Sequence, residues 1–160
     1  MAQTFKLVQV FPASLEKVLA ARERRFEDLS KLENLKGQQI LSQTHEGTVK
    51  ITKRAFSLAD KIPDAIKPMV PAGFLNLEET ARFDEATKIN RFEVTYAQNP
   101  DRLKINGVTK YIDEGATSRR EYQITVKVNM ALIGGILENQ IASSFKKGIE
   151  KDYDNIKEIL

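Results

Sequence analysis

Alternating apolar and polar residues at 3–10 predict a β-strand, which Pro12 ends. The spacing then changes, because apolar residues in 15–35 recur at the intervals of an amphipathic helix. A basic cluster at 22–25 interrupts this apolar stripe. We therefore predict two short helices after the first strand, with Gly37 as the glycine that closes the second.

Six further segments alternate in the same way and are separated by short runs of turn-forming residues. Short turns between consecutive strands are typical of an antiparallel meander. The predicted strands are 39–45, 48–56, 75–83, 88–97, 102–112 and 117–128.

The last segment predicts the longest helix of the chain, with a single apolar stripe along one side. Two glycines, Gly134 and Gly135, lie in its first turn, where each costs about 1 kcal/mol relative to alanine. We expect them to let the helix pass close to the sheet, so that a side chain at Gly135 would push the helix away. The alternative is that bare amides at the helix start attract an anion. The apolar stripe consists of Ile133, Leu137, Ile141, Phe145, Ile149, Tyr153, Ile156 and Leu160.

These elements predict an α+β fold, in which a curved antiparallel sheet of about seven strands wraps around the long C-terminal helix. The chain has 160 residues, of which 41% are hydrophobic and 29% are charged. Those are values of a globular protein, and the length suits one domain over residues 1–160.

The order of elements resembles the helix-grip fold of the START-like (SRPBCC) superfamily, which includes the birch-pollen-allergen proteins and the polyketide cyclases. Gly134, Gly135 and Glu138 match the spacing "GG-x-x-E" at the head of the last helix in a bacterial family of unknown function within that superfamily. The resemblance covers nearly the whole chain. It implies that an apolar ligand is held between sheet and helix.

Composition and motifs argue against several other classes of protein. The 25 basic residues are interleaved with 22 acidic ones, so no basic stripe favours a nucleic-acid partner. There is no cysteine, and the one histidine, His45, stands beside a predicted turn, which suits neither a zinc site nor a Ser-His-Asp relay. We predict no metal and no cofactor. Without a signal peptide or an apolar run of about 18 residues, we expect a cytoplasmic protein.

Polar residues fall among apolar ones on the predicted inner faces of the strands. If the apolar side of each strand faces the helix, Lys53, Glu79, Thr109 and Arg120 also point inward. Inward charges are costly unless they are paired or hydrated, so a cavity for a ligand with a polar end would explain them. The alternatives are rim positions or a β-bulge. The predicted cavity residues are Ile51, Lys53, Leu77, Glu79, Phe92, Val94, Tyr96, Ile105, Thr109, Tyr111, Arg120, Tyr122, Ile124, Leu137 and Ile141.

The connection at 57–74 contains three prolines and is unusually apolar for a loop. We predict that it forms a lid over the cavity through Ile66, Met69, Val70 and Phe74. A transient contact of these residues with a membrane or a protein partner is the alternative.

The predicted function is a non-catalytic carrier or sensor that binds a lipid or other apolar small molecule. The first alternative is an enzyme of the polyketide-cyclase type, in which Glu79, Tyr111 and Arg120 act as acid, base or oxyanion support. The second is a protein-interaction module that uses the same groove. The sequence does not predict the oligomeric state.

Overall fold

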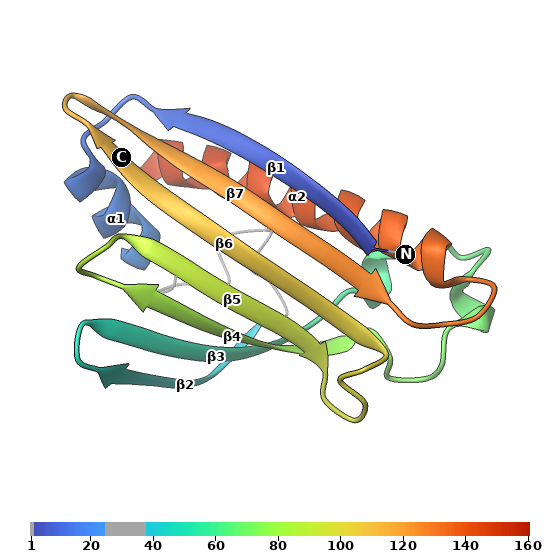
Figure 1. The fold of residues 1–160 in the computed structure, drawn as a ribbon. Helices are drawn as coiled ribbons and strands as arrows, with labels where there is room; N and C mark the ends of the chain where they lie inside the picture. The colour runs from blue at the N-terminus through green and yellow to red at the C-terminus, as the bar shows by residue number, and fades with distance from the viewer. Residues whose placement is uncertain (1, 25–37) are drawn as a thin grey trace.

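The computed structural model describes residues 2–24 and 38–160 (Figure 1). Each predicted strand is found within two residues of its expected bounds, and the predicted α+β helix-grip architecture is confirmed. The second short helix, expected to close at Gly37, lies outside the described residues. The elements are β1 (Ala2–Phe11), α1 (Leu15–Arg24), β2 (Gln39–Glu46), β3 (Val49–Ser57), the short 3-10 helices η3 (Ala59–Lys61) and η4 (Lys67–Met69), β4 (Asn76–Asp84), β5 (Ile89–Tyr96), β6 (Leu103–Glu114), β7 (Thr117–Val128) and α2 (Gly134–Ile159).

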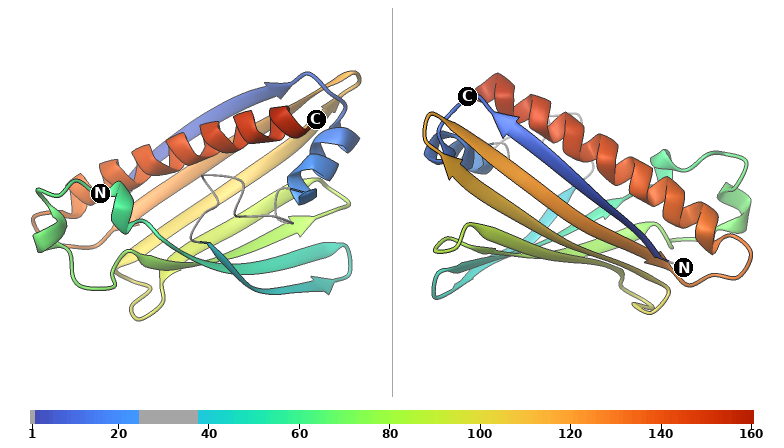
Figure 2. Two further views of the ribbon diagram at one scale, coloured as in Figure 1. Left: turned by 180° about the vertical axis from the view of Figure 1, so that it is seen from behind. Right: turned by 45° about the horizontal axis from the view of Figure 1, so that its top comes forward.

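The seven strands form one antiparallel sheet in the order β1-β7-β6-β5-β4-β3-β2. The first and last strands are neighbours, and the long helix α2 lies along them on the concave side of the sheet (Figure 2). Helix α2 packs chiefly on β7 and β1, and α1 contacts α2, β6 and β7.

The register aligns the inner-facing side chains in rows that cross the sheet. One row consists of Arg54, Glu79, Val94, Ile105, Val126 and Gln3. The next consists of Thr52, Ala81, Phe92, Gly107, Ile124 and Phe5, and the third of Lys50, Phe83, Asn90, Thr109, Tyr122 and Leu7.

The predicted inner face is correct for β4 to β7 and wrong for β3. We expected Ile51 and Lys53 to point inward, but the register places Arg54 opposite the inner residue Glu79, and Lys53 is exposed. The two faces of β3 are both mixed in polarity, so alternation alone does not distinguish them. In the observed orientation of β3, Arg54 forms an ion pair with Glu79, and Phe56 packs against the core.

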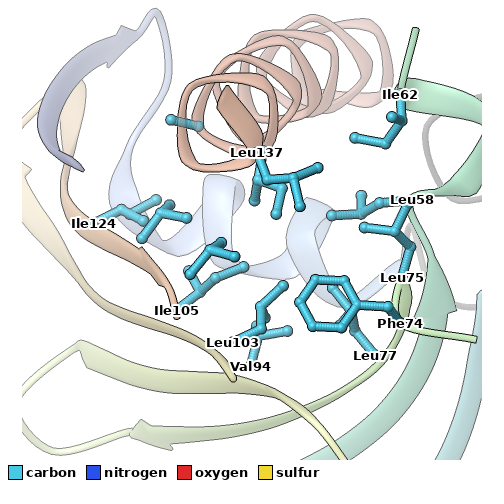
Figure 3. Packing of buried hydrophobic residues seen from close by; sticks show 14 of the residues in the cluster. Leu58, Ile62, Phe74, Leu75, Leu77, Val94, Leu103, Ile105, Ile124 and Leu137 are labelled. Carbon is cyan, nitrogen blue, oxygen red and sulfur yellow. The ribbon is translucent and has the colours of Figure 1, made fainter. Parts of the chain in front are cut away.

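The main apolar core lies between the first half of α2 and the ends of β4 to β7 that face it (Figure 3). The connection between β3 and β4 contributes Leu58, Ile62 and Phe74 to this core. Each such side chain contributes about 1.5–3 kcal/mol when fully buried. A smaller cluster of Phe11, Val18, Ala21 and Ile156 joins β1, α1 and the last turns of α2.

The start of α2 is attached to the end of β7 through the backbone of Val128. Gly134 is buried, and a Cβ atom on it would lie 2.9 Å from the carbonyl oxygen of Val128. The N–H of Val128 donates a hydrogen bond of 2.9 Å to Oε2 of the buried Glu138. Gly134 and Glu138, the first and last residues of the Gly-Gly-x-x-Glu motif, thus both lie against Val128.

The expectation that Gly135 makes the close approach was wrong. Gly135 is exposed, and no atom lies within 4 Å of the position that its Cβ would take. Successive helix residues point about 100° apart, because a turn has 3.6 residues, so only Gly134 faces the strand.

We predict that Gly134→Ala destabilises the protein by about 1–3 kcal/mol, because a backbone carbonyl has to move to admit the methyl group. Gly135→Ala should instead stabilise the protein by up to about 1 kcal/mol, since alanine favours a helix and meets no atom there. Urea denaturation of both variants measures these effects. Equal stability of the two variants would contradict the conclusion that Gly134, and not Gly135, makes the close approach to β7.

Candidate ligand-binding site

Half-buried aromatic side chains lie on the inner face of the sheet next to α2. Phe92 on β5 and Tyr122 on β7 pack against the core without being enclosed by it, as do Phe145 and Ile149 of α2. We define the inner site as Ala81, Asn90, Phe92, Gly107, Thr109 and Tyr122, which occupy neighbouring positions in two rows of the sheet.

The ring of Phe92 lies against the backbone of Gly107 on the adjacent strand. A Cβ atom at Gly107 would be 2.0 Å from Cζ of Phe92, so the glycine makes room for the ring. Gly107 faces inward in register with Phe92 and Ile124. The position of the Phe92 ring in the inner site therefore requires a residue without a side chain at position 107.

Two buried polar atoms of the inner site have no hydrogen-bond partner. They are Oδ1 of Asn90 and Oγ1 of Thr109, whose residues face each other on β5 and β6 and are 9% and 1% exposed. Buried polar groups in native proteins nearly always have a partner, and leaving one without costs about 1–3 kcal/mol. This pair of atoms is therefore suited to bind a polar group that enters the site.

Arg120 points inward as predicted, but it connects elements of the fold. Its Nε and Nη2 donate to Oε1 of Gln9 at 3.0 and 2.6 Å, and its Nη1 donates to Oδ2 of Asp152 at 3.0 Å. Its guanidinium also lies 5.1 Å from the ring centre of Tyr122. Burial alone would lower the pKa of Arg120, but Tyr122, Tyr111 and Asp152 raise it on balance, so the side chain stays charged.

Glu79 also points inward as predicted, and it accepts two hydrogen bonds from Arg54. Nε and Nη2 of Arg54 donate to its two carboxylate oxygens at 2.8 and 2.9 Å. Arg54 also donates to Gln38 and lies over the ring of Phe56. Burial acts to lower the pKa of Arg54, and the carboxylate of Glu79 outweighs that effect and raises it. Glu79 is thus one half of a bidentate ion pair.

Sequence reasoning missed Arg22, which belongs to the edge of this site. Its guanidinium carbon lies 4.7 Å from the ring centre of Phe83 and 5.8 Å from that of Tyr111. Its Nε is a further buried atom without a hydrogen-bond partner. Burial would lower the pKa of Arg22, whereas Tyr111 and Glu23 raise it on balance. The available signal was the basic cluster that interrupts the apolar stripe of the helix.

The remaining predicted cavity residues fall into distinct surroundings. Leu77, Val94, Ile105, Ile124, Leu137 and Ile141 are buried members of the main core. Tyr96 is half-buried against that core, and Tyr111 is buried with Leu15 and Phe83. Ile51 and Lys53 lie on the outer face of β3 and do not reach the inner site.

The predicted lid residues do not share one environment. Phe74 is a buried core residue, and Ile66 and Val70 pack against the core while remaining half-buried. Met69 is 51% exposed. The ends of the connection at 57–74 are thus anchored in the core. That its middle part forms a lid over the cavity stays a prediction.

Described residues form two hollows at the sheet. One, of about 410 Å³, involves the ends of β3, β4 and β5, and its lining includes Ala55, Glu78 and Tyr96. The other, of about 910 Å³, is lined mostly by outward-facing residues such as Arg82 and Arg91, and its lining also includes Phe92, Gly107 and Tyr122 of the inner site. No residue of α2 lines either hollow, so the expected cavity between α2 and the sheet stays a prediction.

Other kinds of site find little support in the described part of the chain. Within residues 2–24 and 38–160, no three acidic or histidine side chains gather in a way that could hold a metal ion. Among the helices in these ranges, none combines the length and apolarity that a membrane span needs.

We predict that Gly107→Ala destabilises the protein by about 1–3 kcal/mol, because the new methyl group and the Phe92 ring cannot occupy the same space. Adding Phe92→Leu should restore part of that loss, since the smaller side chain leaves room. A double-mutant cycle by thermal or urea unfolding measures the coupling. Additive effects of the two substitutions would contradict the packing described above.

Solved structures with the same fold cover almost the whole chain. The Zhui aromatase/cyclase from Streptomyces sp. R1128 matches with a TM-score of 0.66 and 9% identity, over 98% of this chain and 92% of that one. Norcoclaurine synthase from Thalictrum flavum, in complex with dopamine and hydroxybenzaldehyde, matches with a TM-score of 0.61 and 12% identity, over 99% and 86%. A START superfamily protein from Mycobacterium smegmatis matches with a TM-score of 0.60 and 10% identity, over 98% and 99%.

Identities this low show the fold alone, and function does not follow from the fold. No functionally curated protein matches the sequence. A family model does match, over residues 6–160, and its description is a protein of unknown function, DUF2505. The chain therefore belongs to the DUF2505 family, and its helix-grip fold is that of the START-like proteins.

Proposed function

We propose that this protein binds a lipid or other apolar small molecule at the inner site, between α2 and the inner faces of β4 to β7, without catalysing a reaction. The observation that carries the proposal is the pair of buried, unpartnered atoms on Asn90 and Thr109 beside the half-buried ring of Phe92. A dry apolar core would not favour two such polar atoms, whereas a ligand with an apolar body and a polar end would use both surfaces.

Solved structures of the same fold support a small-molecule ligand by analogy. Norcoclaurine synthase was solved in complex with dopamine and hydroxybenzaldehyde, and another match is an aromatase/cyclase. These names show that the helix-grip fold serves proteins that act on small organic molecules. We carry over only the class of ligand, because the sequences share 9–12% identity with this chain.

Ion pairing of the candidate acid and base favours binding over catalysis. A general acid or base has to reach the substrate with a free oxygen or nitrogen. Both oxygens of Glu79 accept from Arg54, and all three guanidinium nitrogens of Arg120 donate to Gln9 or Asp152. An enzyme of the polyketide-cyclase type would have to break one of these pairs in each turnover.

Filling the inner site should abolish binding of a neutral apolar probe. Ala81 faces Phe92 across the strands, so the larger ring in Ala81→Phe takes the volume of a ligand. We predict at least about a tenfold loss of affinity for N-phenyl-1-naphthylamine, measured by its fluorescence, since about 1.4 kcal/mol corresponds to tenfold.

Ala55→Phe is the matched control, because Ala55 lines the hollow of about 410 Å³ at the ends of β3, β4 and β5 and is not part of the inner site. This variant should bind the probe like the wild type. The reverse pattern, with loss only in Ala55→Phe, would place the apolar ligand in that hollow and contradict the proposal.

We further propose that the middle of the connection, residues 63–72, closes over the bound ligand. Leu58, Ile62 and Phe74 anchor its ends in the core, whereas Ile66 and Val70 in the segment between them are only half-buried against it. Hydrogen exchange should show slower exchange in 63–72 when N-phenyl-1-naphthylamine is bound and unchanged exchange at 73–75. Equal exchange in 63–72 with and without the probe would contradict a lid.

A further inference from the structure

Buried or half-buried charged side chains among the described residues of the inner face form ion pairs. Arg54 pairs with Glu79, and Arg120 pairs with Asp152. At the corner where α1 meets β3 and β4, two cations share one carboxylate. Nη1 of Arg22 and Nζ of Lys50 both contact Glu23, at 2.8 and 2.7 Å.

That corner has one more positive charge than negative charge among the described side chains. Glu23 is 44% exposed, whereas the side chains of Arg22 and Lys50 are 11% and 19% exposed. The carboxylate of Glu23 is therefore more exposed to water than the two cations that it pairs with. A buried charge is costly unless it is paired and hydrogen-bonded, so this corner favours a second anion.

The excess charge lies beside the unpartnered atoms of the inner site. Lys50, Phe83, Asn90 and Thr109 are consecutive members of one row of the sheet. The guanidinium of Arg22 stacks on Phe83, the direct neighbour of Asn90. Nε of Arg22, Oδ1 of Asn90 and Oγ1 of Thr109 are three buried atoms without partners. Asn90 and Thr109 face each other on β5 and β6, and Arg22 lies over Phe83, the neighbour of Asn90 on β4.

Each of these groups suits a carboxylate. The Nε–H of Arg22 and the hydroxyl of Thr109 can both donate to carboxylate oxygens, and rotation of the Asn90 amide presents its NH₂ group in place of Oδ1. A neutral hydroxyl or ketone would use the same donors but would leave the excess positive charge unpaired.

We propose that the ligand is an apolar carboxylic acid, whose carboxylate binds Arg22, Asn90 and Thr109 while its hydrocarbon body lies over Phe92 and Gly107. This inference rests on the proposed function and adds the chemical class and the orientation of the ligand. The competing explanation is that ordered water satisfies the three atoms and that the ligand is neutral.

A matched pair of ligands tests the charge requirement. Dodecanoate and 1-dodecanol have the same chain and differ in the head group, and each is titrated against bound N-phenyl-1-naphthylamine at pH 8. We expect dodecanoate to displace the probe at a concentration at least about tenfold lower, because hydrogen bonds to a charged group are about twice as strong as neutral ones. Equal displacement by both would overturn the inference and leave the proposed function standing. Failure of the probe itself to bind the inner site would overturn both.

Thr109→Val tests the position of the carboxylate. Valine has nearly the same shape, so the variant should lose about tenfold in affinity for dodecanoate and keep its affinity for 1-dodecanol. Its ligand-free melting temperature should not fall, because an unpartnered hydroxyl is removed. Thr95→Val, on the outer face of β5, is the control and should change neither affinity.

Arg22→Gln tests the same carboxylate site through a residue of α1, independently of Thr109 on β6. It should reduce the preference for dodecanoate over 1-dodecanol to about twofold or less, and its melting temperature, measured alongside, establishes that the variant is folded. If both Thr109→Val and Arg22→Gln keep the wild-type preference, the three atoms are satisfied by water and the carboxylate site is overturned.

Discussion

The attachment of α2 to Val128 determines where the long helix lies on the sheet. At the helix start, Gly134 admits the carbonyl of Val128 and Glu138 accepts its N–H. Because these groups belong to the last residue of β7, the helix is directed along β7 and β1. The candidate site consists of inward-facing side chains of β4 to β7 next to this helix.

Contacts near the other end of α2 fix the same alignment. Arg120 of β7 pairs with Asp152, and Tyr153 donates to the carbonyl of Val10 on β1. Nη2 of Arg24 in α1 donates to the carbonyl of Ile159. Buried ion pairs are weak evidence for stability, because desolvation of both groups offsets their attraction. Their geometry nevertheless specifies one placement of the helix over these two strands.

Polar residues inside this fold thus serve two different purposes. Arg120, Asp152, Arg54 and Glu79 are paired with one another and connect strands or join the helix to the sheet. Oδ1 of Asn90 and Oγ1 of Thr109 are buried and have no hydrogen-bond partner in the structure. The first kind is explained by the fold alone, whereas the second is the basis of the proposed ligand site.

Local alternation in the sequence determined the strands, the long helix and the inner faces of β4 to β7, because each of these faces has a consistent polarity. It did not determine the face of β3, where Arg54 and Phe56 alternate with Lys53 and Ala55 and the partner strand decides. It also did not distinguish Gly134 from Gly135, since only the position of Val128 selects between them. The surroundings of Arg22, Asn90 and Thr109 were decided by tertiary structure alone, because strand pairing brings Asn90 opposite Thr109 and the packing of α1 on the sheet brings Arg22 over Phe83, the neighbour of Asn90.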